Sequence, residues 1–107
     1  MTLNEYMEAA ARTFRDDTPT GCLENGALGL AGEAGEVCDL VKKWFFQGHE
    51  LHRERIIEEL GDVMWYIALT AKGCGTTLEN VARKNIDKLK KRYPEGFDEE
   101  RSRNRDE

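Results

Sequence analysis

Apolar residues recur at helical spacing along almost the whole chain, and this periodicity constrains the fold more than any other feature of the sequence. No run of alternating apolar and polar residues between turn signals supports a β-strand. Helices are expected over about residues 3–14, 23–46, 52–72 and 76–93. Short connections between them favour antiparallel neighbours. The sequence therefore predicts an all-α fold, an antiparallel four-helix bundle that oligomerisation completes.

The chain is long enough for one small domain. Its 107 residues leave no room for a second hydrophobic core, and capping boxes that begin at Thr2 and Thr76 mark the starts of the first and last helices. Residues 98–107 carry dense charge and no apolar side chain, which predicts weak order. We therefore expect a helical domain over residues 1–97, followed by a charged, disordered tail over residues 98–107.

The charge balance excludes several classes of partner. The 16 basic and 21 acidic side chains give a formal net charge of -5, which argues against broad electrostatic binding to nucleic acid or to an anionic membrane. The three cysteines form no C-x-x-C pair and are interpreted as reduced thiols. The longest apolar run, residues 63–71, is too short to span a bilayer, and the N-terminus lacks the features of a signal peptide. These observations predict a cytoplasmic protein with no nucleic-acid or membrane partner.

Two pairs of acidic residues carry the predicted chemistry. One pair stands three residues apart in the second expected helix and the other stands three apart in the third, so each pair shares one helix face. Antiparallel packing places the two pairs within about one helical turn of the same position along the paired helices. Four carboxylates that face one another repel strongly unless protons or cations intervene. Hard oxygen ligands favour Mg²⁺, with Mn²⁺ as the alternative. The predicted metal ligands are Glu33, Glu36, Glu59 and Asp62.

Four glycines surround the first acidic pair, and each costs roughly 1 kcal/mol relative to alanine inside a helix. We interpret Gly29 and Gly32 as clearing space beside the metal ligands. Gly26 and Gly35 are interpreted as permitting close packing of helices. The alternative is that residues 26–37 form a flexible loop with solvated acids.

Basic and amide side chains gather on one face of the fourth expected helix. Asn85, Lys88 and Arg92 fall within about 60° of one another on the helical wheel. Arg55 precedes Glu59 by one turn of the third helix. Cations beside a metal-loaded acidic site suit a polyphosphate. The alternative for Lys88 and Arg92 is a solvated basic helix end, which the helix dipole favours.

Three segments between about residues 23 and 97 carry a recognisable pattern: GLAGEAGEVCDLVKK, IIEELGDVMWYIA and NIDKLKKRYPEGF. This succession resembles the MazG-like all-α nucleoside triphosphate pyrophosphohydrolases, whose signature is E-x-x-E followed after an interval by E-x-x-D. The resemblance implies magnesium-dependent hydrolysis of a ribo- or deoxynucleoside triphosphate to the monophosphate and pyrophosphate. Such an enzyme is a hydrolase that acts on the α–β phosphoanhydride.

The resemblance also implies roles for individual residues. The two acidic pairs match the family's metal ligands, Glu58 assists them, and Glu36 or Glu58 orients the attacking water as a catalytic residue. Arg55, Lys88 and Arg92 occupy positions used for phosphate contact, and Asn85 is a further substrate-binding candidate on looser spacing.

Aromatic residues predict a subunit interface. Trp44, Phe46, Trp65 and Tyr66 are expected to point away from the helix seams, which leaves more aromatic surface than a monomer tolerates. The family resemblance likewise implies a homo-oligomer, either a dimer or a tetramer. The alternative to an enzyme is a non-catalytic helical interaction module, which would hold no metal between the acidic pairs.

Overall fold

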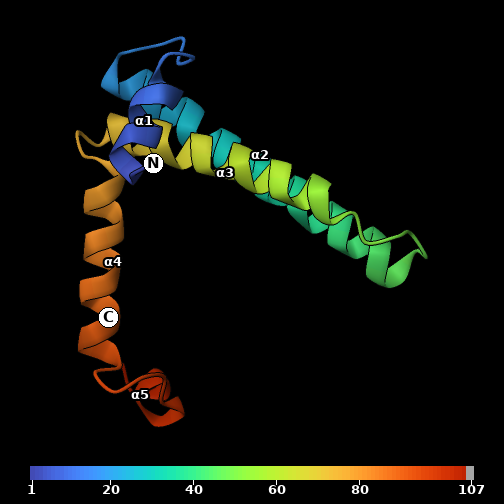
Figure 1. The fold of residues 1–107 in the computed structure, drawn as a ribbon. Coiled ribbons are helices and arrows are strands. Elements are labelled where there is room, and N and C mark those ends of the chain that lie inside the picture. The colour runs from blue at the N-terminus through green and yellow to red at the C-terminus, as the bar shows by residue number, and fades with distance from the viewer. Residues whose placement is uncertain (106–107) are drawn as a thin grey trace.

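The computed structural model describes residues 1–105, and over that range it is helical without a β-strand (Figure 1). Its helices are α1 (Leu3–Ala11), α2 (Pro19–Phe46), α3 (Arg53–Gly73), α4 (Leu78–Arg92) and α5 (Glu99–Arg103). The all-α prediction is confirmed. None of these helices combines the length and the apolar character that a membrane span requires.

Helix starts follow local capping chemistry. The capping box before α1 is confirmed, because Thr2 Oγ1 accepts from the Glu5 amide at 3.0 Å and Glu5 Oε1 accepts from the Thr2 amide at 2.8 Å. Helix α2 begins four residues earlier than predicted, since Thr18 caps it and Pro19 occupies its first turn. The predicted cap of the fourth helix was wrong by one residue: the extended Thr77 accepts from the Asn80 amide at 3.2 Å.

The buried core lies where α1, the start of α2, the end of α3 and the start of α4 meet (Figure 1). Its members are Ala10, Cys22, Ala68, Leu69, Ala71 and Leu78. Polar contacts fasten the same region, because Lys72 Nζ lies 2.8 Å from Asp17 Oδ1 and Trp65 Nε1 donates to Thr13 Oγ1 at 2.8 Å. This junction holds the N-terminal segment against α3.

Beyond this junction, α2 and α3 run on together as a long antiparallel hairpin, while α4 leaves the junction at a steep angle (Figure 1). As a result, the apolar face of α4 stays open: Val81, Ile86 and Leu89 are 41, 48 and 41% exposed. Completion of the bundle by another copy of the chain stays a prediction. The weak order expected of residues 98–107 also stays a prediction. The structure describes residues 98–105 of this tail, which include α5, and residues 106–107 lie outside the described range.

The aromatic residues divide into two groups. Trp65 and Tyr66 were wrongly expected to face outward, because Trp65 packs edge-on against Phe14 with ring centroids 5.1 Å apart and against Tyr66 at 4.9 Å. Trp44 and Phe46, near the tip of the hairpin, are 43 and 76% exposed. This second group is available to a partner.

The glycines of α2 serve close packing more than metal access. At Gly26 an added Cβ would lie 2.9 Å from the Thr70 backbone nitrogen, which confirms the packing interpretation there. At Gly29 it would collide with the Tyr66 ring, so the predicted role in clearing space beside the metal was wrong. Gly32 faces open space, as predicted, and Gly35 does too, which contradicts the packing role predicted for it.

Alanine at Gly26 and Gly32 is expected to change stability in opposite directions. Gly26→Ala should lower the free energy of unfolding by about 1–3 kcal/mol, because Thr70 backbone atoms must move to admit the methyl group. Gly32→Ala should raise it by up to about 1 kcal/mol, since nothing lies within 4 Å and alanine is the better helix former. Urea unfolding in EDTA at one protein concentration measures the free energy of unfolding of both variants. Equal effects of the two substitutions would contradict the close packing at Gly26 and the open space at Gly32.

Candidate metal centre

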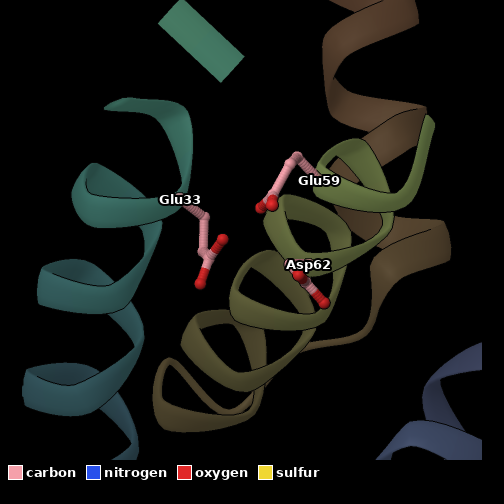
Figure 2. A group of neighbouring side chains, drawn as sticks. All are labelled: Glu33, Glu59 and Asp62. Carbon is pink, nitrogen blue, oxygen red and sulfur yellow. The ribbon is translucent and has the colours of Figure 1, made fainter. Parts of the chain in front are cut away.

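The antiparallel pairing of α2 and α3 brings three predicted metal ligands together. Figure 2 shows Glu33 projecting from α2 toward Glu59 on α3, with Asp62 one turn further along α3. One carboxylate oxygen from each of the three lies within 4.8 Å of the others. We call these residues the acidic cluster. Glu33 and Glu59 are half-buried and Asp62 is exposed, so one side of the cluster is open to solvent.

Like charges shape the electrostatics of the acidic cluster. The pKa of Glu33 lies above its ordinary value, first because its protonated carboxyl shares a hydrogen bond with Glu59 and then because desolvation opposes ionisation. The negative charges of Asp62, Glu59 and Glu36 raise the pKa of Glu33 further. A divalent cation would remove the same repulsion without a proton.

Glu36, the fourth predicted ligand, lies outside the acidic cluster but close enough for its charge to act on Glu33. It lines a hollow of about 120 Å³ nearer the tip of the hairpin, together with the predicted phosphate contact Arg55. His49 and His52 line the same hollow. The structure thus places Arg55 beside Glu36, one turn from the cluster.

The remaining predicted residues lie apart from the cluster. Glu58 is exposed and belongs neither to the cluster nor to the hollow beside Arg55. Asp62 precedes the end of α3 by about 16 Å along the helix, and α4 then carries Lys88 about 15 Å along its own axis in another direction (Figure 1). A single chain therefore does not bring Asn85, Lys88 or Arg92 to the acidic cluster.

Tyr6 is a neighbour of the cluster that the sequence did not reveal. Its pKa is raised, first by burial and then by the negative charge of Asp62, so α1 contributes a phenol near the open side of the cluster. In the sequence Tyr6 is one of several apolar-face residues of the first helix, and no spacing rule distinguishes it from the others.

Comparison with known proteins places the chain in a family. Residues 23–97 match the model of the MazG nucleotide pyrophosphohydrolase domain, which is more than half of the chain. The chain belongs to the MazG family. The match begins in the first turns of α2 and ends beyond α4, so it includes the whole acidic cluster.

One curated relative of this MazG-family chain is the Gene 37 protein of Mycobacterium phage L5, which is 38% identical over 73 residues. The aligned region covers 64% of this chain and 64% of the phage protein, less than two thirds of that relative's length. The name of this phage protein states no activity. No solved structure matches the chain significantly.

The residues present fit a hard divalent cation. Three carboxylate oxygens within 4.8 Å form an all-oxygen donor set, and the neighbouring carboxylates contribute to the raised pKa of Glu33 after its hydrogen bond with Glu59 and its desolvation. Mg²⁺ and Mn²⁺ prefer such oxygen ligands, and Mg²⁺ commonly takes only one or two carboxylates from the protein. MazG proteins are typically metal-dependent, and the acidic cluster is where this chain would hold the ion.

The crowding at Glu33 predicts a pH-dependent difference in stability. A carboxyl whose folded-state pKa is raised contributes stability that is fully present below its ordinary pKa of 4.5 and is lost as pH rises through the raised value. In EDTA, Glu33→Gln should therefore melt near the wild-type temperature below about pH 4.5 and above it at pH 7. Calorimetry across this range measures the difference, and a wild type more stable than Glu33→Gln at pH 7 would contradict it.

Proposed function

We propose that this MazG-family chain hydrolyses a ribo- or deoxynucleoside triphosphate to the monophosphate and pyrophosphate, with Mg²⁺ as its cofactor and Mn²⁺ as a substitute. The observation that carries the proposal is the meeting of Glu33, Glu59 and Asp62 within 4.8 Å in a chain of a pyrophosphohydrolase family. Its nucleotide substrate and metal requirement suit the cytoplasm.

The acidic cluster would hold the metal, with Glu36 as a further ligand. When bound, a divalent cation neutralises phosphate charge and lowers the pKa of a bound water. The protein's own part is to fix the carboxylates on two rigid helices, so that the ligand set exists before substrate arrives.

A carboxylate would orient the attacking water and take its proton. The oxygen of that water bonds to the α-phosphorus while the bond between the α-phosphorus and the α–β bridging oxygen breaks. Pyrophosphate leaves with the electron pair of the broken bond. Glu36 is the better placed of the two predicted candidates, because its charge acts on Glu33 and it lines the hollow beside Arg55, whereas Glu58 does neither. Arg55, beside Glu36, would contact the departing phosphates.

The basic face of α4 would complete the substrate site from another copy of the chain. Within one chain Asn85, Lys88 and Arg92 stand apart from the acidic cluster, yet they are the predicted phosphate contacts (Figure 1). A dimer or tetramer in which α4 of one chain lies against the hairpin of the next would bring them together.

Release of pyrophosphate tests the proposed function. The full chain is incubated with each ribo- and deoxynucleoside triphosphate, with magnesium or with EDTA, and both products are measured. Equal amounts of monophosphate and pyrophosphate, formed only with the metal, are expected. No release from any nucleotide, together with no rise in melting temperature on adding Mg²⁺ or Mn²⁺, would favour the interaction module instead.

A further inference from the structure

A hollow of about 850 Å³ lies between the C-terminal part of α4 and α5, outside the acidic cluster. Figure 1 shows α5 folded back beside that end of α4. Small-molecule sites typically enclose roughly 300–1,000 Å³, so the hollow is large enough for a nucleotide-sized ligand.

The hollow is locally basic in an acidic chain. Among residues 1–105, which the structure describes, five basic and three acidic side chains line it, although the whole chain has a net charge of -5. The basic ones are Lys88, Lys91, Arg92, Arg101 and Arg105. Local positive charge of this kind attracts an anion despite the negative charge of the whole protein.

Most of these cations lack an acidic partner in the part of the chain that the structure describes. There, Lys88, Lys91, Arg101 and Arg105 form no ion pair. The nearby Asp98 is engaged elsewhere, because its carboxylate accepts from the amides of Glu100 at 2.8 Å and of Arg101 at 3.3 Å. Lys88, Lys91, Arg101 and Arg105 are therefore available to a ligand.

Arg103 provides an internal contrast on the same short helix. It does not line the hollow, and its Nη1 lies 4.0 Å from Glu99 Oε2. The two arginines on either side of it in sequence, Arg101 and Arg105, do line the hollow.

We propose that this hollow binds a polyphosphate group, and that Arg101 and Arg105 are binding residues for it. The inference rests on the proposed function and deepens it, because it assigns phosphate contacts to the charged tail as well as to α4. Lys88 and Lys91 are separated by about 4.5 Å along α4, and Arg101 and Arg105 line the same hollow, so the basic side chains form an extended contact that suits a row of phosphates. The guanidinium groups donate paired hydrogen bonds to phosphate oxygens.

Calorimetric titration of the full chain with tripolyphosphate, in EDTA and low salt, tests the hollow without the metal site. Wild type should bind, and Arg101→Gln and Arg105→Gln should each weaken binding about tenfold. The matched control Arg103→Gln should bind like wild type. No wild-type binding at millimolar tripolyphosphate, or an equal loss in all three variants, would overturn the proposal. Circular dichroism confirms that each variant keeps its helices.

Two further ligands distinguish the source of the phosphates. Tighter binding of ATP than of pyrophosphate supports a substrate triphosphate, and tighter binding of pyrophosphate supports the released product. Dependence of binding on Arg101 and Arg105 is expected in either case.

Under turnover, Arg101→Gln should raise KM with little change in kcat. Normal KM in both arginine variants would overturn the hollow's role and leave the proposed hydrolysis standing. Arginine-dependent binding without hydrolysis of any nucleotide would refute the enzyme and leave the polyphosphate site.

Discussion

Glu59→Gln is expected to lower the rate of nucleoside triphosphate hydrolysis at least about 100-fold at saturating magnesium, while the helical fold survives. Glutamine keeps the shape of the side chain but replaces a charged ligand in a cluster whose oxygens lie within 4.8 Å of one another. Glu36→Gln should have an effect of the same order, because Glu36 is both a predicted ligand and the better placed carboxylate for orienting water. Pyrophosphate release measures both.

The control for these substitutions is a matched change on each helix. Glu24→Gln in α2 and Glu54→Gln in α3 remove exposed carboxylates that lie outside the acidic cluster, and both variants should retain wild-type turnover. Wild-type rates in Glu59→Gln would refute the assignment of the metal site. Loss of helicity in Glu59→Gln is not expected, since the substitution relieves repulsion among like charges.

The acidic cluster could be predicted because its geometry follows from two regularities. Spacing of three places Glu59 and Asp62 on one face of α3, and a short connection after α2 forces antiparallel pairing that sets Glu33 opposite them. Both rules act locally. They require no knowledge of how the rest of the chain packs.

What the sequence did not predict depends on contacts between distant segments. The wheel of α3 placed Trp65 on an outward face, but the segment after α1 folds back and supplies Thr13 and Phe14 as its partners. Tyr6 approaches Asp62 for the same reason. Periodicity gives the faces of each helix, whereas the angle between helices decides which faces meet.

The extended shape of the chain predicts that it does not exist alone. Its radius of gyration is 16.7 Å, against about 13 Å for a compact domain of this length. Its accessible surface is 8155 Å², against roughly 6,100 Å² for a compact monomer of 12.2 kDa. The excess of about 2,000 Å² exceeds the roughly 800 Å² that each partner buries in a standard interface. One large interface or two smaller ones would cover it.

The chain is therefore expected to be a dimer or a tetramer at low micromolar concentration. The apolar residues of α4 and the aromatic residues at the hairpin tip provide the surface to be buried, with Ile86 48% and Phe46 76% exposed. Sedimentation equilibrium measures the mass, and an active species of 12.2 kDa would refute the prediction. Ile86→Glu should shift the equilibrium toward the monomer.

Mixing two inactive variants tests whether the partner completes the substrate site. Glu59→Gln damages the acidic cluster and Lys88→Glu damages the basic face of α4, so each variant alone should be nearly inactive. If each site combines the cluster of one chain with α4 of another, half of the dimers in an equal mixture contain both variants. Each mixed dimer then has one undamaged site, so activity should return to about a quarter of wild type after subunit exchange. A mixture no more active than the average of the two variants would mean that α4 does not serve the neighbouring chain's cluster.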